Sequence, residues 1–401
     1  MADESTGECL FHNAELPSEV EMIDLFAGPG GLDVAARWLG IKAVGIEHDR
    51  DACLTRIDAK LGTRQADVRS LELLDIFPNA RILTGGPPCQ TYSVAGSGVG
   101  RKALDQVVRF MSRMADGEDI EAELESLEDD RTGLVLQPLR WALAAIEKGR
   151  PFETIVLEQV PTVLPVWEAL ATALLKHRYD VRVGIVHTEE FGVPQTRRRA
   201  ILIACRDRAA HFPKPTHHRY RKGVPRGQGE ADRLPWTTMS EALPNRSYEF
   251  HVVSNYGTGG DPKLRGRRGS NEPSATVTGK VRRNRIVSKG ADQDRLEPKE
   301  AGRLQTFPID YPWAGLDQYQ QVGNAVPPRV GAHILAAAVF GEKPEETSLD
   351  QAVGGLWESA LSGKHDLKRE PLPQPDEVDG LFDEHGRPYR VDLDSISAYS
   401  A

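Results

Sequence analysis

Residues 21–40 read EMIDLFAGPGGLDVAARWLG, and this stretch decides the fold class. The apolar run at residues 21–26 predicts a strand, which ends in the glycine-rich turn AGPGG. After the turn, LDVAARWLG has the apolar spacing of a helix and Gly40 is a stop signal. The stretch therefore predicts a strand, a tight turn and a helix in succession.

The same alternation continues along the first half of the chain. Apolar strands are predicted at residues 43–48, 80–86, 153–158 and 199–205, and helix-like segments lie between most of them. Continuous apolar strands that alternate with helices are typical of a parallel sheet covered on both faces. The predicted fold class is α/β, with helices on both faces of the sheet.

Composition limits the class of protein. The four cysteines among 401 residues form no CxxC pair, which suits a reducing compartment and gives no metal site. The chain has no apolar run of about 18 residues for a membrane span, and its first residues lack the pattern of a signal peptide. We expect a cytoplasmic monomer without membrane contact.

Charge is segregated along the chain, although the net charge is -9. Residues 206–289 hold 18 Lys and Arg against 7 Asp and Glu. Acidic residues gather instead at 105–130, with 10 acidic and 2 basic, and at 341–401, with 14 acidic and 6 basic. A segregated basic segment indicates a polyanionic partner, and a solvated charged face is the alternative.

The patterns divide the chain into four segments. Residues 1–205 and 296–341 form one discontinuous α/β domain, with an acidic helical insertion near 103–130. Residues 206–295 lose periodicity and are rich in Pro, Gly and Arg, which predicts a small irregular domain. Residues 342–401 form an acidic tail that we expect to be partly disordered.

A nucleoside-containing cofactor is the favoured ligand of the glycine-rich turn. The turn departs from GxGxxG, so a purely structural tight turn is the alternative. Glu47 ends the second strand 19 residues after Gly28, the offset at which such folds bind ribose hydroxyls. Asp67 is placed to end a third strand. All three would meet at the carboxyl edge of the sheet, where these folds bind ligands.

A candidate nucleophile lies in GGPPCQTYS, residues 85–93, where the strand at 80–86 ends. Two prolines before Cys89 stiffen the turn and remove N–H donors, so the thiol is held and presented outward. A buried structural cysteine is the alternative, but burial seldom needs Gly-Gly-Pro-Pro before the thiol. The pattern favours a nucleophile at Cys89.

Two further motifs supply a partner for such a thiol. Glu158 in LEQV ends another strand, where a carboxyl group often has a shifted pKa. QTRRR places Arg197, Arg198 and Arg199 just before a strand, where they could bind phosphate or a base carbonyl. A helix cap, an ion pair or a surface cluster are the alternatives.

The motifs together resemble one enzyme family. DLFAGPGG, GGPPCQTYS, LEQV, QTRRR, RLQTFP and QQVGNAVPP occur in the order and approximate spacing of the DNA (cytosine-5) methyltransferases of prokaryotic type, over residues 22–340. The resemblance implies a Rossmann-like sheet that binds S-adenosylmethionine and yields S-adenosylhomocysteine. It also implies that residues 206–295 are a target-recognition domain for duplex DNA.

The resemblance also implies roles for individual residues. Cys89, beside Pro88, resembles the nucleophile, and Glu158 the acid that holds the target cytosine; Arg197 and Arg199 match the two arginines of the family motif QxRxR, in which Gln195 is structural. The cofactor-binding residues it implies are Phe26, Ala27, Gly28, Gly30, Gly31, Glu47, His48, Asp67, Val68, Leu134, Asn324 and Val326. The candidate DNA-binding residues are Gln90, Ser93, Arg101, Arg265, Arg267, Arg268, Arg282, Arg283 and Arg285.

The implied chemistry explains these residue types. A thiolate adds at C6 of cytosine and makes C5 nucleophilic enough to accept a methyl group. Glu158 relieves the charge that builds at N3, and Arg199 stabilises the charge at O2. The base must first flip out of the duplex.

Two departures from the family pattern stand out. Gln159 replaces the usual Asn, which puts the support of the Pro88–Cys89 turn in question. The acidic insertion lengthens the loop after Cys89. Because acid near DNA is unfavourable, we expect the insertion to project away from the phosphates or to contact another protein. Deletion of residues 103–128 should then leave methyl transfer detectable.

Several functions remain open on the sequence. The favoured one is the modification enzyme of a restriction or phage-defence system, with a restriction or defence protein as candidate partner. The alternatives are a transfer RNA cytosine-5 methyltransferase of the same fold, a catalytically weak DNA-binding regulator, and a nicotinamide-dependent oxidoreductase. The last is disfavoured because Pro-Pro-Cys-Gln has no role in it.

Overall fold

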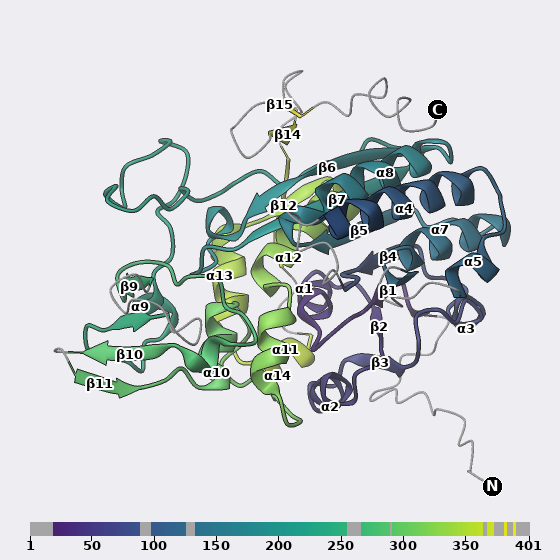
Figure 1. Cartoon of the computed structure of the whole chain (residues 1–401). Helices are drawn as coiled ribbons and strands as arrows, with labels where there is room; N and C mark the ends of the chain where they lie inside the picture. The colour runs from purple at the N-terminus through teal and green to yellow at the C-terminus, as the bar shows by residue number, and fades with distance from the viewer. Residues whose placement is uncertain are drawn as a thin grey trace, which may run out of the picture.

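The computed structural model describes residues 19–88, 98–125, 133–254, 266–288, 291–363, 367–372, 381–382 and 388–389. Its centre is a seven-stranded sheet with the order β3-β2-β1-β4-β5-β7-β6 (Figure 1). The strands are β1 Met22–Leu25, β2 Ala43–Glu47, β3 Gly62–Gln65, β4 Ile82–Gly85, β5 Thr154–Gln159, β6 Tyr179–His187 and β7 Arg198–Arg206. The five strands predicted from apolar runs are all confirmed, within one or two residues at their ends.

The expectation of a wholly parallel sheet is wrong at β7. Strands β3, β2, β1, β4 and β5 run parallel, whereas β7 is antiparallel to both β5 and β6. The link from β6 to β7, residues 188–197, is too short for the crossover that a parallel pair needs. This reversal brings the start of β7 to the same edge as the end of β5, with Gln159 opposite Ala200.

Side chains alternate along the strands to build a core on each face of the sheet. Ile23 and Leu25 of β1 join a cluster with α4, α7 and α8, whereas Met22 joins a second cluster with α1 and α12. The helices of the first face are α4 Gly98–Ala115, α7 Gln137–Glu147 and α8 Leu164–Leu175. The short helices α3 Leu73–Ile76 and α5 Glu121–Glu125 lie with them. Those beside the second face are α1 Gly31–Trp38, α2 Arg50–Asp58 and α12 Pro328–Leu335, which continues as a π-helix over Ala336–Phe340.

The acidic insertion is helical and packs against the rest of the fold. Val107 and Met111 of α4 are fully buried, and Phe110 and Met114 are nearly so. These side chains belong to the same hydrophobic cluster as α8 and β5. On the exposed side of the insertion, Arg113 pairs with Glu118 and Glu123. The expectation that this segment is dispensable therefore fails on packing.

The predicted irregular domain contains a four-stranded sheet of order β11-β10-β8-β9. Its elements are α9 Met239–Ala242, β8 His251–Val253, β9 Arg267–Gly269, the 3-10 turn Val281–Arg283, β10 Arg285–Ser288 and β11 Ala291–Asp294. Its core also includes side chains of α10 Pro298–Leu304 and α11 Gln318–Asn324, such as Leu304 and Val322. The boundary placed at residue 295 thus cuts through a shared core.

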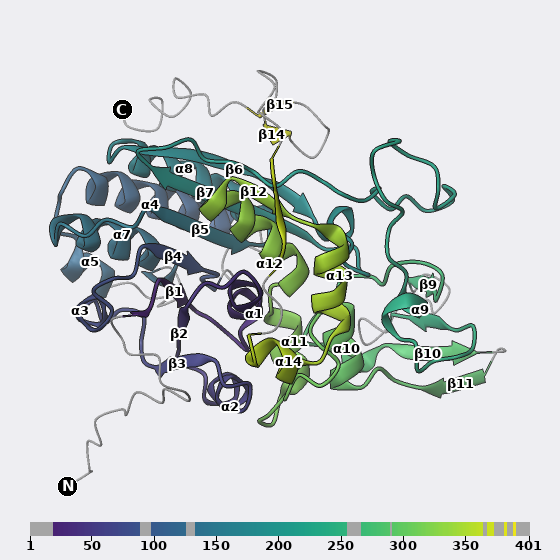
Figure 2. The same ribbon diagram turned by 180° about the vertical axis from the view of Figure 1, so that it is seen from behind.

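The α/β domain extends beyond residue 341, where the sequence predicted a separate tail. Residues 342–372 contain β12 Glu342–Pro344, α13 Glu346–Gly354, α14 Trp357–Leu361 and β13 Arg369–Pro371. Leu349, Trp357 and Leu367 are buried in the core beside α1 and α12. Figure 2 shows α13 and α14 lying along this side of the molecule. Short strands β14 Leu381–Phe382 and β15 Pro388–Tyr389 follow.

Within the described residues, no helix is both long and apolar enough to span a membrane.

Candidate active site

The glycine-rich turn between β1 and α1 has the backbone conformation of a ligand cradle. Phe26 and Gly28 have φ of 56° and 54°, and Gly30 has φ of 99°. A side chain on Gly31 would place its Cβ 2.1 Å from the carbonyl oxygen of Val326, whereas a Cβ on Gly28 would meet nothing within 4 Å. The turn is thus packed on one side and open on the other.

Glu47 is tied directly to this turn. Its Oε2 accepts a hydrogen bond of 2.7 Å from the Gly28 amide, and its Oε1 accepts from the amides of His48 and Asp49. Because β2 lies next to β1, the 19-residue offset seen in the sequence becomes direct contact. Asp67 follows β3 two residues beyond its end and is exposed, with Oδ1 accepting from the Arg69 amide.

The remaining predicted cofactor residues differ in exposure. Val68 is buried, and its carbonyl accepts from the Trp141 indole at 2.7 Å. Asn324 is exposed, and its Oδ1 accepts from Gln320. Of the rest, Ala27, Gly30 and Gly31 are buried, Phe26, Gly28, Leu134 and Val326 are half-buried, and His48 is exposed.

A buried ionic cluster lies beneath the turn. Arg56 of α2 donates to both carboxylate oxygens of Asp33 in α1, at 2.7 and 2.8 Å, and both side chains are almost fully buried. Burial raises the pKa of Asp24 in β1 well above its usual range, and neighbouring Asp33 adds to this. The hydroxyl of Thr84 donates to Asp24 at 2.6 Å. The cluster fixes α1 and α2 relative to the turn between β1 and α1.

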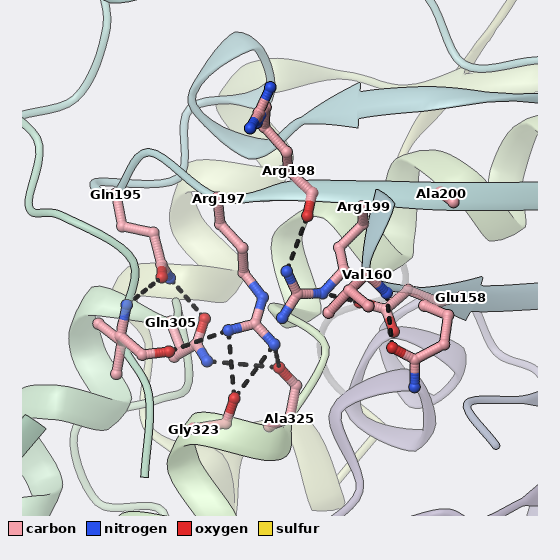
Figure 3. A network of polar contacts seen from close by, with 12 residues as sticks. Glu158, Val160, Gln195, Arg197, Arg198, Arg199, Ala200, Gln305, Gly323 and Ala325 are labelled. Atoms are coloured by element: carbon pink, nitrogen blue, oxygen red, sulfur yellow. Dashed lines mark hydrogen bonds and ion pairs between the residues drawn. The ribbon is translucent and has the colours of Figure 1, made fainter. Parts of the chain in front are cut away.

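Glu158 and Arg199 form a close ion pair at the edge where β5 ends and β7 begins (Figure 3). Arg199 Nε lies 2.6 Å from Glu158 Oε1, and the two side chains are 14% and 8% exposed. Gly86, which follows β4, is beside this pair, since a Cβ there would lie 3.8 Å from Glu158 Oε2. A carboxyl group and a guanidinium are thus held together next to the turn that leads to Cys89.

Arg197 is buried and points the other way, and its two terminal nitrogens are engaged by main chain (Figure 3). Its terminal nitrogens donate to the carbonyls of Val277, Gly323 and Ala325 at 2.9 to 3.2 Å. Burial, together with nearby Arg199, lowers the pKa of Arg197 to about 9. These contacts join β7 to the second domain and to the end of α11.

Gln195 is buried among the same segments. Its amide nitrogen donates to Gln305 Oε1 at 2.5 Å, and its oxygen accepts from the Val277 amide at 2.8 Å. Gln305 in turn donates to the Val322 carbonyl at 2.7 Å. QTRRR and RLQTFP, far apart in sequence, therefore form one polar joint.

Gln159 supports the proline turn. Its amide nitrogen donates to the Pro87 carbonyl at 2.6 Å, and its oxygen accepts from the Val160 amide at 2.5 Å. The longer side chain thus bridges the end of β5 and the turn after β4. Pro88 follows, half-buried.

Two other cysteines are structural. Cys53 and Cys205 are buried, and their thiols lie against the carbonyls of Glu47 and Ala338. Burial, with neighbouring Glu47, raises the pKa of Cys53 to about 12. Burial also raises the pKa of Cys205. Such thiols are poor nucleophiles at neutral pH.

Part of the predicted DNA-binding set lies on the sheet of the second domain. Arg267 in β9 and Arg285 in β10 are both opposite Val253 in β8, so they flank it on one exposed face. Arg282 and Arg283 are exposed just before β10. Arg268 points to the opposite face, and its guanidinium lies 4.3 Å from the centroid of the Tyr220 ring.

Other predicted residues lie outside this description: Cys89, Gln90, Ser93 and Arg265 are not among the described residues, and the side chain of Arg101 in α4 is not described.

Sequence reasoning missed several residues that shape the site. Tyr311 is fully buried, and its hydroxyl donates to the Pro29 carbonyl in the glycine-rich turn. The Asp33–Arg56 pair was likewise missed. The only signal for the Asp33–Arg56 pair in the sequence was a charged residue at a helix position where an apolar one is expected. Tyr311 had no such signal, because no spacing rule points to a residue 282 positions from its partner.

Fold and site define a class: a Rossmann-like methyltransferase with a polar site beside its cofactor turn. The sequence model of the C-5 cytosine-specific DNA methylase family matches residues 20–109 and 128–339. The chain belongs to this family and is a DNA cytosine-5 methyltransferase. The unmatched residues 110–127 coincide with most of the acidic insertion.

Known relatives agree with this assignment. The chain is 24% identical to the type II methyltransferase M.AplI of Arthrospira platensis, over 82% of this chain and 86% of that protein. It is 27% identical to M1.HphI of Haemophilus parahaemolyticus, over 79% and 86%. The structure of the Dnmt2 methyltransferase of S. pombe is similar in fold, with a TM-score of 0.52 and 16% identity over 80% of this chain and 100% of that chain.

Proposed function

We propose that this enzyme transfers a methyl group from S-adenosylmethionine to C5 of a cytosine flipped out of duplex DNA, through a covalent adduct of Cys89 with C6. The observation that carries the proposal is the Glu158–Arg199 pair beside the proline turn. This pair and the glycine-rich turn lie on either side of β4, at the point where the strand order reverses. Open α/β sheets bind ligands at such a point.

The residues at the carboxyl edge fit S-adenosylmethionine. Gly28 leaves open space where a side chain would be, and the Glu47 carboxylate stands beside it with the exposed Asp67 on the next strand. Glu47 would hold the ribose hydroxyls and Asp67 the adenine amine, with Phe26 and Leu134 as apolar contacts. When bound, this cofactor supplies an electrophilic methyl group.

Cys89 is proposed as the nucleophile. Its thiolate forms a bond to C6 of cytosine, and the electron pair of the C5–C6 double bond becomes available at C5. After C5 has accepted the methyl group, a base takes the C5 proton and the thiolate leaves, which restores the double bond. The two buried cysteines offer no alternative, because burial raises the pKa of each.

Glu158 and Arg199 are proposed to bind the target base. Addition at C6 builds negative charge at N3 and O2, and donors fixed in advance stabilise such charge. Glu158 shares a proton with N3 of the base, while the Arg199 guanidinium faces O2. The 2.6 Å contact between them fixes both side chains before the base arrives.

Arg197 and Gln159 are proposed as positioning residues. Arg197 is engaged by three main-chain carbonyls, so it holds β7 against α11 and the second domain. Gln159 holds the Pro87 carbonyl and so sets the course of the chain toward Cys89. Neither role requires contact with the reacting base.

The second domain is proposed as the target-recognition domain. Arg267, Arg282, Arg283 and Arg285 gather on or next to one exposed face of its sheet. Arginines placed in this way neutralise phosphates and reach base edges. The names of the relatives support a role as the modification enzyme of a type II restriction system.

One experiment tests the proposal. The wild-type protein and Cys89→Ser are incubated with S-adenosylmethionine labelled in its methyl group, and with either duplex DNA or transfer RNA. Label in DNA that disappears in Cys89→Ser is the expected result. Label only in RNA, or in neither, would contradict the proposal. Bisulfite sequencing of methylated plasmid then gives the target sequence.

A further inference from the structure

We propose that α14, which lies beyond the region matched by the family, is a positioning element for the cofactor turn, and that Trp357 acts on the turn through Tyr311. The proposal rests on the proposed function, since it assigns the turn to S-adenosylmethionine. The match to the family ends at residue 339, so α13 and α14 lie in an extension outside the matched region.

The first contact joins Tyr311 to the turn. Its hydroxyl donates to the carbonyl of Pro29, between Gly28 and Gly30, and its side chain is fully buried. A Cβ on Gly30 would lie 3.2 Å from the same hydroxyl. Because Gly28 and Gly30 both have positive φ, the Pro29 peptide could rotate if its carbonyl were released. The hydroxyl therefore holds the turn in one conformation.

The second contact joins Trp357 to Tyr311. The two ring centroids are 5.6 Å apart at an interplanar angle of 66°. Trp357 is itself fixed at both ends: its indole N–H donates to the Ala59 carbonyl at 2.9 Å, and its amide donates to Asp310 Oδ1 at 2.7 Å. Asp310 directly precedes Tyr311, so Trp357 holds both the ring and the backbone of that segment.

The extension is anchored well enough to serve as a support. Arg329 of α12 pairs with Glu346 and Asp350 of α13, at 2.5 Å each. Arg303 donates to the Val353 carbonyl at 2.5 Å, and Arg37 of α1 donates to the Leu361 carbonyl at 2.8 Å. These contacts bind the extension to α12 and to α1, and α1 is the helix that directly follows the cofactor turn (Figure 2).

Conservative variants separate positioning from general packing. Tyr311→Phe keeps the ring and removes only the hydroxyl that holds Pro29. Tyr179→Phe is the matched control: Tyr179 is also buried, and its hydroxyl also donates to a main-chain carbonyl, that of Phe152 at 2.7 Å, but at the opposite edge of the sheet. Trp357→Phe tests the second contact.

The measurement is the Kd for S-adenosylmethionine by calorimetry without DNA, together with hydrogen exchange across residues 26–34. We expect Tyr311→Phe to weaken binding by about 3- to 10-fold, as loss of one hydrogen bond implies, and to speed exchange in the turn, while Kd for duplex DNA is unchanged. Tyr179→Phe should leave cofactor binding as in the wild type. Trp357→Phe should also weaken binding of S-adenosylmethionine. The double variant should bind about as weakly as the Tyr311→Phe variant, because both substitutions remove the same support.

The outcomes distinguish the two proposals. Suppose that the wild-type protein binds S-adenosylmethionine. The positioning role alone would then be overturned if Tyr311→Phe had the same Kd as the wild type. It would also be overturned if Tyr179→Phe weakened binding as much as Tyr311→Phe does. Additive losses in the double variant would overturn the action of Trp357 through Tyr311. A wild-type protein that binds no S-adenosylmethionine would overturn the proposed function and this inference with it.

Discussion

Glu158 and Arg199 are the residues on which the proposed chemistry depends most. Arg199 begins a strand and Glu158 nearly ends one, so they would lie at opposite edges of a wholly parallel sheet. The antiparallel β7 brings them to the same edge, 2.6 Å apart. The reversal of one strand therefore creates the Glu158–Arg199 pair.

At this scale we predict the effect of Glu158→Gln. The amide cannot supply the proton toward N3, so kcat should fall by about 100- to 1000-fold, the usual cost of removing one such donor, while duplex DNA still binds. Single-turnover methylation and a DNA-binding titration measure the two quantities. Glu153→Gln, just before the start of the same strand and exposed, is the control. An equal loss in both variants would remove Glu158 from the chemistry.

Gln159 provides a second prediction. Gln159→Leu leaves the Pro87 carbonyl without its donor, so the turn before Cys89 loosens and kcat should fall about 10-fold. Gln159→Asn keeps an amide and should retain more activity than the leucine variant. Both should bind S-adenosylmethionine as the wild type does, by calorimetry. If Gln159→Leu is as active as the wild type, the amide does not position the turn.

The sequence predicted most of the residues of the site because motif residues end strands. Glu47 was placed from its offset to Gly28, and it indeed contacts that residue. The buried contacts were not predictable in this way. Tyr311 reaches Pro29 across 282 positions, and Arg197 is held by carbonyls from two distant segments. Such contacts depend on packing between elements, which local periodicity does not encode.

At the scale of elements, α4 illustrates how composition misleads. The acidic residues of the insertion suggested a dispensable helical segment, and its helical state is confirmed. Its apolar residues, however, recur at helical spacing, and Val107, Phe110, Met111 and Met114 all face the core. Acid on one face of a helix says nothing about the other face.

The corresponding prediction concerns stability. Met111→Ala removes a fully buried side chain of α4 and should lower the free energy of unfolding by about 2–5 kcal/mol. Arg109→Ala, on the exposed face of the same helix, should be within about 0.5 kcal/mol of the wild type. Urea titration measures both. Deletion of residues 103–128 should prevent folding, and a folded deletion protein would show that α4 is not part of the core.

For the molecule as a whole, segregated charge reconciles an acidic chain with a DNA substrate. The net charge is -9, yet the basic residues concentrate in the second domain. The sequence predicted that domain from charge and loss of periodicity. It could not give its edge, because Leu304 and Val322 from the following helices complete its core.

The salt dependence of DNA binding tests this division. Arg282→Ala with Arg283→Ala should reduce the slope of log K against log salt by about 2, because each arginine would neutralise about one phosphate. The control is the double variant Lys148→Ala with Arg150→Ala, which removes the same amount of positive charge. Both residues precede β5, at the opposite edge of the sheet, and pair with Asp75. That control should leave the slope unchanged. Equal changes in both pairs would mean that net charge, and not this face, governs binding.

The central claim is covalent catalysis by Cys89, and trapping tests it most directly. Duplex DNA substituted with 5-fluorocytosine is incubated with the enzyme and S-adenosylmethionine. Fluorine at C5 cannot be removed by a base as a proton is, so the thiolate cannot leave and the adduct accumulates. The account predicts a complex that survives detergent, with the DNA attached to the peptide of Cys89 in mass spectra and no complex in Cys89→Ser. DNA that binds and is methylated without forming this adduct, or an adduct at another cysteine, would contradict it.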